Sequence, residues 1–102
     1  MSRKQSESFE VRNFEVIFTS RFKKAWKKYE RSGKYNPERF YNILRVLAAG
    51  KELEGVYRDH QLRGDMQYYR ECHIESNLLL IYEYSGEQLR LVDFGTHAEL
   101  FG

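Results

Sequence analysis

The sequence predicts one small α+β domain, in which an N-terminal strand and a helical hairpin pack on an antiparallel sheet of about four strands. The chain has 102 residues, enough for one hydrophobic core but not for two. Apolar residues recur at helical spacing in the first half of the chain and in strand-like runs in the last third. Hydrophobic residues make up 41% of the chain, which is typical of a folded protein.

The N-terminal third predicts a tail, a strand and a helix. Residues 1–8 are polar and are expected to form a flexible tail. Alternating apolar side chains predict a strand near residues 12–18. Ser20 is the expected N-cap of the first helix, which Gly33 ends. Apolar residues at helical spacing form the buried stripe of this helix, and they are Phe22, Ala25, Trp26 and Tyr29.

A second helix and a long loop follow. Asn36 is a suitable N-cap, and Pro37 fits the first helical position, where its missing N–H is not needed. Gly50 is expected to end this helix. Residues 51–65 have no clear periodicity, so they are interpreted as a loop. A loop of this length in a compact domain is often functional.

The last third predicts three antiparallel strands and one helical turn. Leu78–Ile81 is apolar on both faces, so the strand that contains it should be central in the sheet. Thr96 and Glu99 have the spacing of a capping box that opens a final turn of helix. The expected strands cover residues 68–74, 78–84 and 88–94.

Several classes of protein are excluded by composition. The single cysteine, Cys72, rules out an internal disulfide and Cys-rich zinc sites, and its apolar neighbours place it in the core. No apolar stretch approaches the length of a membrane span, and residues 1–8 lack the apolar region of a signal peptide. A cytoplasmic protein is therefore expected.

Three histidines are the candidates for chemistry: His60, His73 and His97. Each lies near the boundary of a predicted element, and none belongs to a metal-binding motif. A lone histidine is usually a hydrogen-bonded or surface residue, but three in one part of the chain favour a site. Imidazole suits RNA cleavage, in which the attacking 2′-hydroxyl loses a proton and the leaving 5′-oxygen gains one.

Strand parity separates the side chains of the first C-terminal strand. Cys72 and Ile74 are expected in the core, so His73 and Glu75 should point to the opposite, open face. Arg70 shares the parity of the core. A structural role for Arg70, in which carboxylates or carbonyls accept its hydrogen bonds, is therefore slightly favoured over a role in RNA binding.

Lysines cluster on the first helix. The formal net charge of +2 is too small to indicate a nucleic-acid partner by itself. A lysine-rich helix face is more often a solvated surface than a phosphate-binding patch, and both interpretations stay open. The clustered residues are Lys23, Lys24, Lys27 and Lys28.

Four motifs follow one another in the second half of the chain. They are Asp59-His60-Gln61-Leu62-x-Gly64, Tyr69-Arg70-Glu71-Cys72-His73-Ile74, Leu79-Leu80-Ile81-Tyr82 and the closing Gly95-Thr96-His97-Ala98-Glu99-Leu100-Phe101. In this order the motifs resemble the YafQ-type toxins, a branch of the RelE/ParE-like superfamily. The first and the last motif together are the most specific part of the resemblance.

The resemblance implies a RelE-like fold and the toxin of a type II toxin–antitoxin system. Such toxins are endoribonucleases that cut messenger RNA in the ribosomal A site, with no metal or other cofactor. The implied partner is a DinJ- or RelB-type antitoxin, through which alone operator DNA would be bound.

By position, the resemblance also implies a set of site residues. Because His97 opens a helical turn whose free N–H groups favour a neutral imidazole, we expect it to transfer protons. His60 and His73 would share the complementary acid or base role, and Phe101 would stack on a base. The expected RNA-binding residues are Arg63, Arg70, Arg90, Lys23, Lys24, Lys27 and Lys28.

Two positions depart from the family pattern. Asn77 stands where the family has a catalytic aspartate, and an amide can hydrogen-bond but cannot carry charge. Asp93 stands where relatives often have arginine, and its charge would oppose phosphate binding. Glu75 is a possible substitute for the missing carboxylate, and Arg63 and Arg90 are candidates to compensate for Asp93.

These departures leave three hypotheses open. The leading one is an active ribosome-dependent messenger-RNA endonuclease. The second is a catalytically weak or degenerate toxin that acts mainly as an antitoxin-binding or co-repressor module. The third is a gyrase-directed toxin of the ParE type, which three imidazoles on one surface argue against.

Overall fold

The computed structural model describes residues 13–102, so the predicted tail at residues 1–8 and the start of the predicted first strand lie outside it. No helix in this part of the chain is long and apolar enough to cross a membrane. The elements are β1 (Glu15–Phe18), α2 (Ser20–Ser32), α3 (Pro37–Ala48), β2 (His60–Gln61), β3 (Arg70–Glu75), β4 (Leu78–Ser85), β5 (Gln88–Gly95) and α4 (His97–Phe101), with short 3-10 turns η1 (Gly55–Tyr57) and η2 (Gly64–Met66).

The predicted α+β architecture is confirmed, but the sheet differs from the expected one. It has five strands in the order β1-β5-β4-β3-β2. Residues 60–61, expected within a loop over 51–65, pair with β3 as a short edge strand. Strand β1 runs parallel to β5, whereas the other neighbours are antiparallel. A two-residue strand has no periodicity to detect, and the partner of β1 lies about seventy residues away in sequence, as the Glu15–Gln88 pair shows.

The caps of the two long helices follow from local sequence. The N-cap of α2 is Thr19 and not Ser20: its Oγ1 accepts the Phe22 N–H at 3.2 Å and donates to the Leu91 carbonyl at 2.8 Å. The second bond ties the start of α2 to β5, which explains why threonine at this position is the better cap. Gly33 ends α2 in the left-handed conformation, as predicted. Asn36 caps α3 through the Glu38 N–H, also as predicted.

An aromatic cluster fills the space between the sheet and the helices. Phe94 of β5, 3% exposed, lies at its centre. Its ring contacts those of Trp26 at 5.4 Å and Tyr29 at 4.9 Å between centroids. The high aromatic content therefore serves the core first, as the offset and edge contacts of such rings allow. Other aromatic side chains remain exposed: Phe18, Tyr41, Tyr68, Tyr84 and Phe101.

Cys72 is fully buried in this core, as predicted. Burial raises the pKa of its thiol well above the ordinary value, and Asp59 and Glu71 add to the effect. Since only the thiolate is reactive, we expect native Cys72 not to react with Ellman's reagent at pH 8. The unfolded protein in guanidinium should release one equivalent of the chromophore at once. A prompt full reaction of the native protein would contradict the buried placement.

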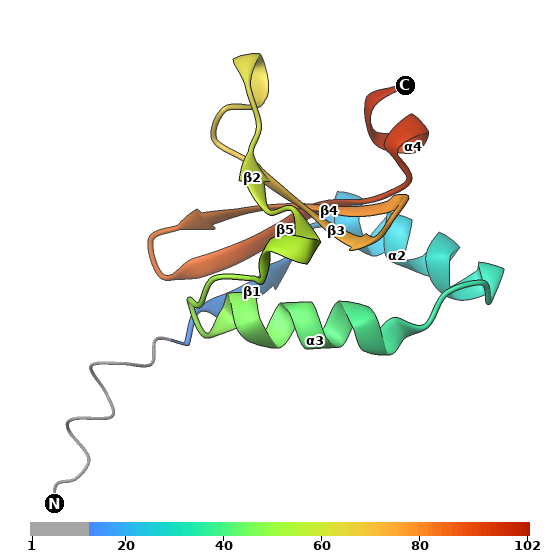
Figure 1. Ribbon diagram of the computed structural model, residues 1–102, viewed down its shortest axis with the longest axis horizontal. Helices are drawn as coiled ribbons and strands as arrows, with labels where there is room; N and C mark the ends of the chain where they lie inside the picture. Colours follow the sequence, from blue (N-terminus) through green and yellow to red (C-terminus); the bar gives the residue numbers. More distant parts are fainter. Residues whose placement is uncertain (1–12) are drawn as a thin grey trace, which may run out of the picture.

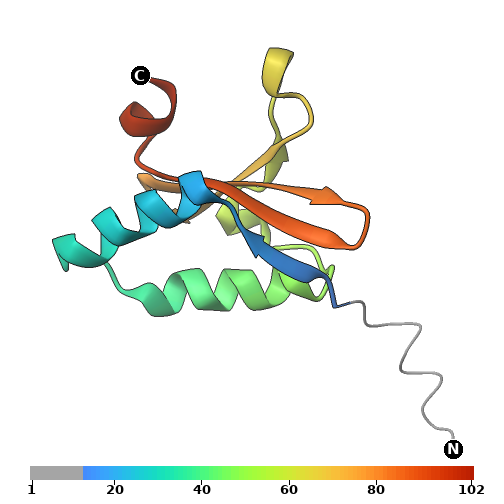
Figure 2. The same cartoon turned by 180° about the vertical axis from the view of Figure 1, so that it is seen from behind.

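The two faces of the sheet are covered by different parts of the chain. Helices α2 and α3 lie on one face (Figure 1). The β2 segment and α4 rise on the opposite side, as the reverse view also shows (Figure 2). Leu79 and Ile81 of β4 are 1% and 2% exposed and lie outside the helix-side core cluster. The central strand is therefore buried on both faces, as its apolar sequence predicted.

Candidate functional site

Two histidines and a buried carboxylate meet on the face opposite the long helices. His60 pairs with Glu71 across the β2–β3 ladder, and His73 lies two residues further along β3. Oε1 of Glu71 is 3.3 Å from Nε2 of His60 and 3.9 Å from Nε2 of His73. Glu71 is 6% exposed, so its carboxylate is held between two imidazoles and away from water.

Both ring nitrogens of His60 have a partner within the protein. Nδ1 lies 2.7 Å from the Arg58 carbonyl oxygen, and Nε2 faces the Glu71 carboxylate. Both partners accept hydrogen bonds and neither can donate one. The imidazole of His60 is therefore held in place by contacts at both of its nitrogens.

The floor of this site is apolar. Ile81 lies opposite Glu71 in the sheet, and Leu79 lies opposite His73. Charged and polar groups over such a floor interact more strongly than they would in water, because the local dielectric constant is low. The apolar floor therefore strengthens the electrostatic interactions of the Glu71 carboxylate.

His97 and Phe101 approach the same face from α4. Their rings are in contact, with centroids 5.1 Å apart. His73, Leu79 and Gly95 are aligned across β3, β4 and β5, so α4 begins at the end of the sheet where His73 lies. Two strand spacings separate β3 from β5, or about 10 Å. His73 and the start of α4 therefore lie at the same end of the sheet, two strands apart.

Asn77 holds the first turn of α4. Its Oδ1 accepts a hydrogen bond from the His97 backbone N–H at 3.3 Å. An amide oxygen is sufficient for this contact, which needs no negative charge. The Asn77 side chain therefore connects the β3–β4 turn to the helix that carries His97.

Arg70 belongs to a hydrogen-bond network beside His60 that is separate from the contacts of Glu71 with the two imidazoles. Its Nε donates to Oδ1 of Asp59 at 3.2 Å, and the Tyr82 hydroxyl donates to the same oxygen at 2.6 Å. Burial and the hydrogen bond to the Asp59 carboxylate raise the pKa of Tyr82 above its usual range, so its hydroxyl stays protonated. Because Asp59 precedes His60, this network ties the β2 segment to β3 and β4.

The other predicted cations are dispersed. Arg90 is paired with Glu83 at 3.4 Å, and Arg63 is exposed beside η2. Lys28 is bound to Glu99 at 2.6 Å. The other three lysines of the cluster, Lys23, Lys24 and Lys27, are exposed along α2.

Two acidic residues lie elsewhere than the sequence suggested. Glu75 was expected beside His73, but its Oε2 lies 4.0 Å from Nε of Arg39, on the helix side. A register shift between His73 and Glu75 breaks the alternation of the strand and explains the difference. Asp93 is paired with Arg21 at 2.9 Å, and its side chain is 14% exposed. Its charge is therefore offset by a residue that sequence reasoning missed.

Sequence reasoning also missed the role of Glu71. Strand parity placed it on the correct face, but its contact with His60 depends on β2, which has no sequence signal. Within residues 13–102, no group of three or more histidine, cysteine or acidic side chains is arranged to hold a metal ion.

The chain was compared with known proteins. A family model described as "Bacterial toxin of type II toxin-antitoxin system, YafQ" matches residues 14–102. The mRNA interferase toxin YafQ of Escherichia coli strain B is 31% identical over 88 residues, which cover 86% of this chain and 96% of that protein. In a second E. coli strain, a protein of the same name is 46% identical over 50 residues, which cover 49% of this chain and 54% of the relative, about half of each.

A solved structure supports the same relationship. YafQ in the crystal structure of the E. coli DinJ-YafQ complex matches with a TM-score of 0.81 and 28% identity, over 88% of this chain and 100% of that one. These matches agree with the resemblance drawn from the sequence motifs.

Proposed function

This chain belongs to the YafQ family of bacterial type II toxins, and on that premise we propose that it is an mRNA endoribonuclease, the toxin of a toxin–antitoxin pair. The observation that supports cleavage most directly is the buried Glu71 carboxylate between the imidazoles of His60 and His73. A third imidazole, that of His97, extends the group on the same face of the sheet.

The chemistry we propose is attack by the 2′-hydroxyl on the adjacent phosphorus. His97 takes the proton of the attacking hydroxyl, and the leaving 5′-oxygen receives a proton from the imidazole pair of His60 and His73, which share the complementary role. The P–O5′ bond breaks as the P–O2′ bond forms, which leaves a 2′,3′-cyclic phosphate and a 5′-hydroxyl. Glu71 holds His60 and His73 in place, and the cationic imidazoles offset charge on the phosphorane-like transition state.

The surroundings of the histidines would bind and orient the RNA. Phe101, 39% exposed and in contact with His97, is placed to stack on a splayed base. Asn77 serves by holding the first turn of α4. The exposed Arg63 and the α2 lysines Lys23, Lys24 and Lys27 would contact phosphates, whereas Arg70 acts through the network with Asp59.

The setting we propose follows that of the relatives. The E. coli relative is named an mRNA interferase, and its solved complex contains DinJ. We therefore assign this chain a DinJ-type antitoxin, and messenger RNA in the ribosomal A site as substrate. The chain would act as a single domain over residues 1–102 in the cytoplasm, where ribosomes are found, and would reach operator DNA only through the antitoxin.

A reconstituted translation reaction tests this function. The purified protein is added with and without ribosomes, and new 5′ ends are mapped on the messenger RNA. We expect cuts that need ribosomes and disappear with His97→Ala, because that change removes the group that accepts the proton. Circular dichroism of the variant checks that it is folded.

Intact message with the folded wild-type protein would favour the second hypothesis, a toxin that binds antitoxin but cleaves weakly. One observation supports that alternative. Asn77 cannot supply the charge of a carboxylate, and its Oδ1 already accepts the His97 N–H. In that case Asn77→Asp should restore measurable cleavage.

A further inference from the structure

Helix α4 carries two residues of the proposed site but has little apolar anchorage. It has five residues, and none of them is buried. Isolated helices of this length are not stable in water. Forming the first turn loses conformational entropy, and so short a helix forms too few hydrogen bonds to offset that loss. The position of His97 and Phe101 must therefore depend on contacts that α4 makes with the rest of the domain.

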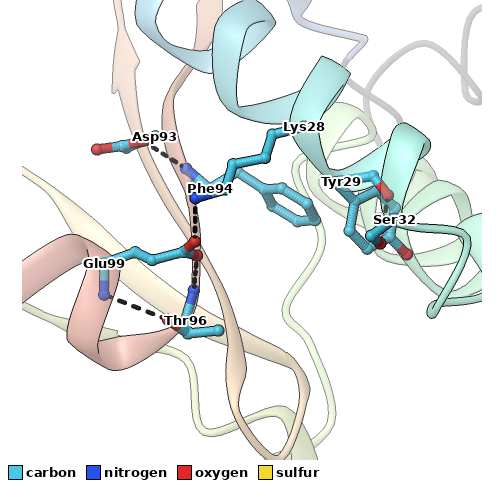
Figure 3. Close-up of polar contacts among 7 residues, drawn as sticks. All are labelled: Lys28, Tyr29, Ser32, Asp93, Phe94, Thr96 and Glu99. Carbon is cyan, nitrogen blue, oxygen red and sulfur yellow. Dashed lines mark hydrogen bonds and ion pairs between the residues drawn. The ribbon is translucent and has the colours of Figure 1, made fainter.

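Glu99 of α4 contacts both Lys28 of α2 and Thr96 (Figure 3). Its Oε2 is 2.6 Å from Nζ of Lys28 on α2, about seventy residues away in sequence. Its Oε1 accepts the Thr96 backbone N–H at 2.8 Å, and its own N–H donates to Oγ1 of Thr96 at 3.2 Å. One carboxylate thus closes the capping box and bridges α4 to α2.

Gly95 provides the space that this carboxylate occupies. A Cβ atom at position 95 would lie 2.8 Å from Oε1 of Glu99, closer than such atoms approach. Gly95 is itself buried. The fit between a side-chain-free residue and the Glu99 carboxylate fixes the path of that side chain toward Lys28.

We propose that Lys28 and Glu99 form a latch that fixes α4 against α2 and thereby positions His97 and Phe101 for RNA cleavage. The inference rests on the proposed function, since it gives α4 a role in the site. It makes Lys28 a positioning residue. The other lysines of α2 differ from Lys28, because none of them forms a salt bridge within residues 13–102.

The charges of the latch are suited to neutral pH. The hydrogen bond from Lys28 and that from Thr96 lower the pKa of Glu99 below its ordinary value. A lowered carboxyl pKa contributes stability above the unfolded value that is lost as the pH falls through the folded one. The latch is therefore fully formed near neutrality.

The expected effect is moderate, because the side chains of Lys28 and Glu99 are 75% and 42% exposed. Exposed ion pairs contribute little in water. Loss of this pair should therefore lower the population of molecules in which α4 is docked by about two- to fivefold. Since misplaced groups do not react, kcat should fall by the same factor. The KM for RNA should change less than kcat, because only the stacking of Phe101 is weakened and no phosphate contact is lost.

The test compares Lys28→Met, Glu99→Gln and the double variant in the translation reaction, with kcat and KM measured separately. Lys51→Met is the matched control, since Lys51 is exposed and lies outside the proposed site and the latch. In parallel, the backbone ¹⁵N heteronuclear NOE of residues 97–101 is measured on the free proteins, without RNA.

We expect each single variant to lower kcat two- to fivefold and to reduce the NOE of α4, with no further loss in the double variant. Lys51→Met should change neither value. A rise in KM alone with Lys28→Met would overturn the latch and assign Lys28 to phosphate binding. An unchanged kcat and NOE would also overturn it. If the wild-type protein cuts no RNA, the proposed function fails, and the NOE values alone decide whether the latch exists.

Discussion

Glu71→Gln is expected to lower kcat for messenger-RNA cleavage by about 10²- to 10³-fold, the range for losing a group that supports acid–base and charge stabilisation. Glutamine keeps the size of the side chain and one acceptor oxygen. It removes the negative charge that faces the imidazoles of His60 and His73. The measurement is the initial rate of cleavage in the translation reaction, with chemical denaturation as a check of folding.

Glu75→Gln is the matched control for this change. Glu75 lies on the same strand, but its carboxylate faces Arg39 of α3 at 4.0 Å. Loss of a long, partly exposed pair should have little effect on cleavage. Equal losses in both variants, or full activity of Glu71→Gln, would refute the role assigned to the carboxylate between the imidazoles.

Asp59→Ala is expected to lower the free energy of unfolding by about 2–4 kcal/mol, because it removes the acceptor shared by two side chains. Tyr82 is 0% exposed, and its hydroxyl would lose the Asp59 oxygen to which it donates at 2.6 Å. The Arg70 guanidinium would lose its ion pair at 3.2 Å. Urea denaturation should show a lower midpoint with little change in slope.

Tyr82→Phe separates the parts of this network. It removes one hydroxyl and leaves the Asp59–Arg70 pair intact, so a smaller loss of about 1 kcal/mol is expected. If Asp59→Ala cost no more than Tyr82→Phe, the network would not be what ties the β2 segment to the sheet. A cleavage rate that falls further in Asp59→Ala than stability explains would indicate that His60 has moved.

Features that depend on neighbouring residues were predictable from the sequence. Asn36 and Gly33 mark helix boundaries because caps are local hydrogen-bond and backbone preferences. The capping box of Thr96 and Glu99 formed as predicted for the same reason. Alternation along β3 placed Cys72 in the core, and apolar residues on both faces made β4 central. The motifs from Asp59 onward were enough to indicate the family.

Contacts between residues far apart in the sequence were visible only in the folded domain. The register shift in β3 turned Glu75 toward α3, and strand periodicity cannot reveal such a shift. Strand β2, too short for a pattern, brought His60 to Glu71. Lys28 belonged to a lysine cluster in the sequence, yet the fold paired it with Glu99. Contacts of this kind arise from non-local packing, in which a side chain's partner is set by the path of the whole chain rather than by its neighbours in sequence.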